Sequence, residues 1–139
     1  MFMVNNVDNF INIAYKEAQK AYKKREVPVG AIIVKDGKII AKAHNLKEKK
    51  KSPLAHAEIL CIEKACKKIN NWRLDNCIMY VTLYPCNMCL GAIKESRINT
   101  VIYAANRENI TNIDEKCIYI KDDRCLNIIQ QFFKELRRK

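Results

Sequence analysis

Residues 76–96 read NCIMYVTLYPCNMCLGAIKES, a stretch that combines two kinds of hydrophobic pattern. Its first half is an apolar run rich in β-branched and aromatic side chains, which is typical of a buried strand. After Pro85 the run NMCLGAIKES predicts a short helix. The stretch therefore predicts a strand that leads into a helix, with two cysteines at the junction.

Cys86 and Cys89 form a Cys-x-x-Cys pair. Such a pair occurs in redox couples, structural zinc sites and catalytic metal centres, and the pair alone leaves all three open. In the first turn of a helix, residues three apart lie on one face, and the positive end of the helix favours their thiolate forms.

A second polar motif, AHAEIL, precedes the cysteines and contains His56 and Glu58 at the start of another predicted helix. A catalytic zinc usually has three protein ligands and an open position for water, and His56, Cys86 and Cys89 supply that number and type. Glu58 is then a candidate proton carrier. Residues two apart on a regular helix point about 200° apart. His56 and Glu58 therefore meet only if the helix begins beside them.

His-x-Glu followed by Pro-Cys-x-x-Cys is the signature of zinc nucleobase deaminases. A redox dithiol has no use for the His-Ala-Glu segment. The combination therefore favours a catalytic zinc over a structural zinc or a redox pair.

The remaining pattern alternates helices with strands. Helical spacing of apolar residues predicts helices over roughly 8–25, with Asp8 as a cap, over about 55–70, and from Asp122 or Asp123 to the end. Asp36-Gly37 between two apolar runs predicts a β-hairpin, and residues 47–52 read as a lysine-rich loop. Two more strands are expected in NTVIYAA and KCIYIK. This order predicts an α/β protein with one mixed sheet covered by helices, in a single domain over residues 1–139.

Composition limits the environment and the partners of the chain. Its 26 Lys and Arg outnumber 15 Asp and Glu, a formal net charge of +11 that favours polyanionic partners, although a lysine-rich composition bias gives the same excess. Seven cysteines, without a signal peptide or a membrane-length apolar run, predict reduced thiols, a cytoplasmic location and no membrane partner. Five cysteines at apolar positions are expected to be buried and inert: Cys61, Cys66, Cys77, Cys117 and Cys125.

From about Phe10 to its end the chain resembles the bacterial tRNA adenosine deaminases, which convert the wobble adenosine of an anticodon to inosine. The resemblance lies in EVPVGAIIVKDGKII, AHAEIL, MYVTLYPCNMCLGAI, SRINTVIYAA and FFKELRR. It implies a three-layer α-β-α cytidine-deaminase-like fold with a mixed five-stranded sheet flanked by helices. It also implies a homodimer that binds a tRNA anticodon loop.

The same resemblance implies roles for individual residues. His56, Cys86 and Cys89 would bind one Zn²⁺ per chain, and Glu58 would be the proton shuttle of a hydrolytic deamination by zinc-activated water. Asn45, which would hydrogen-bond the flipped base or its ribose, and Ala57 would contact the substrate. From the residues alone, Asn45 is equally a turn residue at the end of a strand.

One residue and one segment of the chain depart from the pattern of that family. Tyr84 precedes Pro85 where the family usually has Glu, so we expect a phenol near the metal. Residues 106–116, NRENITNIDEK, contain no glycine and replace a longer Gly-rich segment that helps to hold the anticodon loop. An alternative function is therefore deamination of a free base or nucleoside, such as guanine, cytosine or cytidine. A third hypothesis, a silent RNA-binding subunit, is disfavoured by the presence of Glu58.

Overall fold

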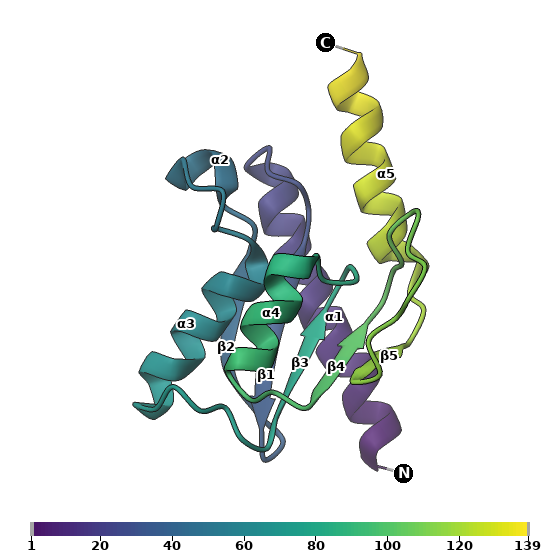
Figure 1. Ribbon diagram of the computed structural model, residues 1–139. Coiled ribbons are helices and arrows are strands. Elements are labelled where there is room, and N and C mark those ends of the chain that lie inside the picture. Colours follow the sequence, from purple (N-terminus) through teal and green to yellow (C-terminus); the bar gives the residue numbers. More distant parts are fainter. Residues whose placement is uncertain (1, 139) are drawn as a thin grey trace.

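A mixed five-stranded sheet forms the centre of the protein (Figure 1), whose computed structural model describes residues 2–138. The strands are β1 (Gly30–Lys35), β2 (Lys38–His44), β3 (Cys77–Val81), β4 (Thr100–Tyr103) and β5 (Cys117–Tyr119), in the order β2-β1-β3-β4-β5. β1 is antiparallel to β2 and β3, whereas β3, β4 and β5 are mutually parallel. The carboxyl ends of the three parallel strands therefore lie at one edge of the sheet.

Helices cover both faces of the sheet (Figure 1). The helices α1 (Phe2–Lys23) and α5 (Asp123–Arg137) lie on one face, and α3 (Ala57–Ile69) and α4 (Asn87–Glu95) lie on the other. The central strands β1, β3 and β4 are buried almost throughout, as expected for strands with helices on both sides. This arrangement confirms the predicted three-layer α-β-α fold.

The close contact between α1 and β1 depends on small residues. Ala14, Ala18 and Ala21 are fully buried on the helix, and Gly30 begins the strand. A Cβ atom at Gly30 would lie 2.1 Å from the backbone oxygen of Ala14. Gly30 therefore allows the two backbones to approach each other.

A short helix, α2 (Lys47–Lys50), forms where the sequence predicted only a loop. Its amino end is capped by Glu26, which is buried although it is an acid. The two carboxylate oxygens of Glu26 accept hydrogen bonds from the backbone nitrogens of Glu48 (3.0 Å) and Lys49 (2.8 Å). Because the cap comes from a distant part of the chain, local sequence does not reveal this helix.

Other differences from prediction concern helix ends and thiols. The first helix begins at Phe2 instead of about residue 8, so Asp8 is an exposed helical residue and not a cap.

Of the five cysteines expected to be buried, Cys66 is partly exposed and the other four are buried. Burial raises the pKa of Cys117 to about 11 and that of Cys125 to about 12, which keeps both thiols protonated and unreactive at neutral pH.

Within residues 2–138, none of the helices combines the length and the apolar character that a membrane-spanning helix requires.

We predict that Gly30→Ala destabilises the protein by at least the ~1–3 kcal/mol typical of overpacked cores, because the methyl group meets the backbone of α1. Urea unfolding followed by circular dichroism measures this loss. Gly91→Ala in α4 is the matched control: its Cβ meets no atom within 4 Å, and alanine favours a helix. Equal stability of the two variants would contradict the close-packing argument.

Candidate active site

Two helices begin at the same place, beyond the carboxyl end of β3. His56 is the N-cap residue of α3 and Cys86 is that of α4, and both have an extended backbone, with ψ of 152° and 172°. Neither side chain makes a capping hydrogen bond to its own helix. The imidazole and the thiol are therefore available to a shared site between the helices.

The three predicted ligands meet in this site. The Nδ1 atom of His56 lies 3.7 Å from Sγ of Cys86 and 3.6 Å from Sγ of Cys89, and all three donor atoms lie within 4.8 Å of one another. A tetrahedral zinc with bonds of about 2.3 Å to sulfur and about 2.0–2.1 Å to nitrogen separates the two kinds of donor by roughly 3.6 Å. The spacing and the chemistry of this donor set thus fit a zinc ion.

Protonation also suits a cation site. Burial lowers the pKa of His56, and the charges of Lys47 and Arg107 lower it further, so the imidazole is neutral at neutral pH. Burial raises the pKa of the Cys89 thiol, and Glu58 and Cys86 add to the effect. The dipole of α4 therefore does not suffice to ionise Cys89, and a cation that binds here must displace the thiol proton.

The carboxyl group of Glu58 faces the same site. On a regular helix the side chains of His56 and Glu58 would point about 200° apart. Here α3 begins only at Ala57 and His56 has an extended backbone, so both side chains can face the same site. Glu58 is 2% exposed, and burial raises the pKa of its carboxyl group, against the opposing effects of its own backbone hydrogen bond, Arg107 and Cys89. A carboxyl group with a raised pKa can both accept and donate a proton near neutral pH.

A cavity of about 230 Å³ adjoins this cluster. Ligand pockets commonly measure about 300–1,000 Å³, so this one suits a small flat ligand such as a single nucleobase. Polar groups at the start of α3 meet apolar walls from α5 and from the segments before β1 and after β3. The lining residues are Val27, Val29, Asn45, Lys47, His56, Ala57, Glu58, Leu83, Arg107, Ile129 and Phe133.

Both residues predicted to contact a substrate line the cavity. Asn45 is buried, and its amide nitrogen donates to the Val27 carbonyl (3.2 Å) while its amide oxygen accepts from the Lys47 backbone nitrogen (3.1 Å). One N–H and one lone pair of the amide remain for a ligand. Ala57 is fully buried at the first position of α3, where a helix leaves its N–H groups without internal partners. Asn45 thus combines the turn role with a place in the cavity.

His44, which precedes Asn45, is not among the residues that line the cavity. Its Nδ1 atom lies 2.9 Å from the Glu17 carboxylate, and its Nε2 atom lies 3.0 Å from Nζ of Lys24. The ring therefore joins β2 to α1.

Tyr84 does not direct its phenol toward the three candidate metal ligands, contrary to expectation. Its ring packs edge-on against Tyr103, with 5.0 Å between centroids, and its hydroxyl accepts a hydrogen bond from the Asp114 backbone nitrogen (2.9 Å). The side chain thus points toward β4 and the segment before β5. Since the ring packs there, the substitution affects the segment around Asp114 and not the ligand cluster.

Sequence reasoning missed Arg107. Its Nε atom donates to the carbonyl oxygen of Tyr84 at 2.6 Å, and its side chain lines the cavity. One signal could have revealed it: Arg107 follows β4 closely, as Cys86 follows β3, and the carboxyl ends of neighbouring parallel strands share one edge of the sheet.

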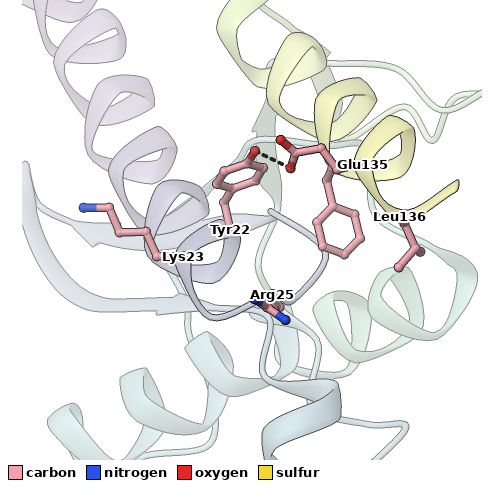
Figure 2. Close-up of a pocket in the computed structure, with 6 residues that line it drawn as sticks. Tyr22, Lys23, Arg25, Glu135 and Leu136 are labelled. Atoms are coloured by element: carbon pink, nitrogen blue, oxygen red, sulfur yellow. Dashed lines mark hydrogen bonds between the residues drawn. The ribbon is translucent and has the colours of Figure 1, made fainter. Parts of the chain in front are cut away.

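The helix α5, which supplies Ile129 and Phe133 to the cavity wall, is tied to α1 near both ends. Near its start, Arg124 donates to the Asn12 side chain at 2.9 Å and lies over the ring of Tyr15. Near its end, the hydroxyl of Tyr22 donates to Glu135 beside a separate cavity of about 450 Å³ (Figure 2). These contacts fix the wall of the active site.

Residues 5–137 match the family model of the MafB19-like deaminases. The chain belongs to this deaminase family. It is 44% identical to the tRNA-specific adenosine deaminase of Aquifex aeolicus over 92% of this chain and 94% of the relative. A solved tRNA:A34 deaminase, from work on A-to-I editing at the wobble position, is similar with a TM-score of 0.77 and 32% identity, over 87% of this chain and 99% of the other. The guanine deaminase of Bacillus subtilis is similar with a TM-score of 0.69 and 33% identity, over 91% and 93%.

We predict that the deaminase is purified with a full equivalent of zinc and that Cys89→Ala abolishes this binding, because two ligands hold a catalytic ion poorly. Elemental analysis by mass spectrometry measures the metal content. Cys61→Ala, which removes a buried thiol of α3 outside the cluster, is the control and should keep its zinc. A Cys89→Ala protein with undiminished zinc would show that these residues do not form the metal site.

Proposed function

We propose that this protein hydrolytically deaminates adenosine to inosine at the wobble position of a tRNA anticodon. The proposal rests on three features that occur together: the His-Cys-Cys cluster, the buried carboxyl group of Glu58, and sequence similarity to tRNA-specific adenosine deaminases over nearly the whole chain. The net charge of +11 supports a polyanionic substrate.

His56, Cys86 and Cys89 would hold one Zn²⁺ per chain. When bound, zinc supplies a Lewis acid that lowers the pKa of a water molecule to near neutrality. The two thiolates and the neutral imidazole leave such a site without net charge, so a separate proton carrier is required.

Glu58 is the proton carrier. Its carboxylate accepts a proton from the attacking water, then donates it to a ring nitrogen of the base and assists the departure of ammonia. The low exposure of Glu58 keeps bulk water from competing for this proton.

Asn45 and Ala57 orient the base. The spare N–H and lone pair of the Asn45 amide can hydrogen-bond the base or its ribose, since its other contacts to Val27 and Lys47 hold the amide in place. The small side chain of Ala57 leaves room for the base next to Glu58. Leu83 and Ile129 supply apolar walls that exclude water.

The proposal includes a homodimer that works in the cytoplasm, where tRNA is found. Leu54, close to His56 in the chain, is 57% exposed, and a second subunit would cover this leucine beside the active site. Sedimentation equilibrium at micromolar concentration tests the assembly, and a mass equal to one chain would contradict it.

Deamination of free guanine is the second candidate. It is favoured by the 33% identity to the guanine deaminase of Bacillus subtilis. Purified protein incubated with an adenosine-containing anticodon stem-loop, and separately with guanine, cytosine and cytidine, distinguishes the two by inosine and ammonia detection. Inosine in the stem-loop with a rate that falls with added salt supports the first function. Turnover of a free base with an inert stem-loop supports the second.

We predict that Glu58→Gln keeps zinc and lowers the single-turnover rate of inosine formation by at least the ~10²–10⁴-fold typical of general acid–base catalysis. Elemental analysis and rapid-quench kinetics give the two readouts. Glu63→Gln makes the same carboxyl-to-amide change at an exposed position on the same helix and should behave as wild type. Full activity in Glu58→Gln would exclude the proposed proton transfer.

A further inference from the structure

Arg107 lies at the junction of two hollows. It lines the catalytic cavity of about 230 Å³, and it also lines an adjoining groove of about 690 Å³ between the segment after β4 and α5. Leu83, Ile129 and Phe133 also line both. A ligand that extends from the cavity into the groove must therefore pass this side chain.

The two hollows differ in what they can hold. The cavity suits one base, whereas the groove is larger and carries the cationic side chains of Lys134 and Arg137 from α5, which outnumber its one other charged group, Glu108, beside Arg107. When the base of a polynucleotide occupies the cavity, the adjoining groove is large enough to take its sugar and phosphates, and the shared residues Leu83, Arg107, Ile129 and Phe133 lie between the two. Arg107 therefore lies where the backbone next to the target nucleotide would run.

Arg107 is already held in place. Its Nε atom donates to the Tyr84 carbonyl oxygen at 2.6 Å, just before Pro85 and the metal-ligand candidate Cys86. The hydroxyl of the same tyrosine accepts from the Asp114 backbone nitrogen at 2.9 Å. Tyr84, which is 4% exposed, thus anchors the segment from Arg107 to Asp114 at both ends.

The terminal nitrogens of the Arg107 guanidinium have no hydrogen-bond or ion-pair partner in the described part of the chain. A guanidinium with a fixed Nε and free terminal nitrogens presents a planar fork that matches two phosphate oxygens. Because the side chain is already ordered, little conformational entropy is lost on binding.

We propose that Arg107 binds a phosphate group that adjoins the deaminated nucleotide, and thereby makes the enzyme select a nucleotide within a polynucleotide over a free nucleoside. This inference rests on the proposed function and assigns a specificity-determining residue to it. Tyr84 is the positioning residue for Arg107.

The test removes one phosphate charge at a time. Two anticodon stem-loops are prepared, in which a neutral methylphosphonate replaces the phosphate on the 5′ side or on the 3′ side of the target adenosine. The sugar that precedes the replaced linkage is 2′-deoxy in each. Each is compared with a charged stem-loop of the same sugar composition. In wild type, one of the two replacements should lower kcat/KM by roughly 10- to 100-fold, the effect of one charge-assisted hydrogen-bonded contact.

Arg107→Gln should be slower on the charged stem-loop by a similar factor and should respond less than about 2-fold to the same replacement, because the contact is already lost. Arg73→Gln is the matched control: it loses the same charge in the exposed loop before β3, at the opposite end of that strand, and should respond as wild type does. Thermal melting and zinc content check both variants.

Two results would overturn the inference: a wild type that tolerates both neutral linkages, or an Arg107→Gln that is as sensitive as wild type. The wild-type comparison requires no variant, so a wild type that tolerates both neutral linkages overturns the inference even if Arg107→Gln fails to fold. An Arg107 that only tunes Glu58 would slow charged and neutral stem-loops equally. Absence of inosine from the charged stem-loop with wild type overturns the proposed function itself, and the role of Arg107 falls with it.

Discussion

The site depends on one backbone constraint, that two helices begin at the same edge of the sheet with extended N-cap residues. Most N-cap side chains accept a hydrogen bond from their own helix, but His56 and Cys86 do not. Their side chains instead point into the space between α3 and α4. The same extended conformation lets Glu58 share that space with His56, which a continuous helix would forbid. Ligand spacing, burial of the carboxyl group and the shape of the cavity all follow from these two helix starts.

The other side of the cavity comes from a different layer of the fold. The helix α5 contributes Ile129 and Phe133, and it lies on α1 through hydrogen bonds near both of its ends. The helix α1 packs on β1 closely enough that Gly30 tolerates no side chain. A chain of contacts therefore links the wall of the active site to the centre of the sheet. This explains how a base-sized cavity can keep its shape although its parts come from both faces.

Much of this arrangement could be predicted from the sequence. The order of strands and helices followed from the spacing of the apolar residues. That His56, Glu58, Cys86 and Cys89 lie together could be predicted because a catalytic zinc centre requires this combination of side chains. Arg107 could not be predicted in the same way, because residues 106–116 have no period and the position of Arg107 depends on the Tyr84 carbonyl. The short helix α2 escaped prediction since its cap, Glu26, comes from another element. The direction of the Tyr84 ring was predicted wrongly because it depends on packing against Tyr103.

The capping of α2 by Glu26 has a consequence for the lysines around it. One internal carboxylate holds the main chain of α2 through the N–H groups of Glu48 and Lys49. Within the described residues, the side chains of Lys49, Lys50 and Lys51 make no hydrogen bond or ion pair that would help to keep the shape of this helix. Evolution can therefore change the number and identity of these cations without rebuilding the turn. The protein thus possesses a region where its long-range attraction to nucleic acid can drift while the hydrolytic centre stays as it is.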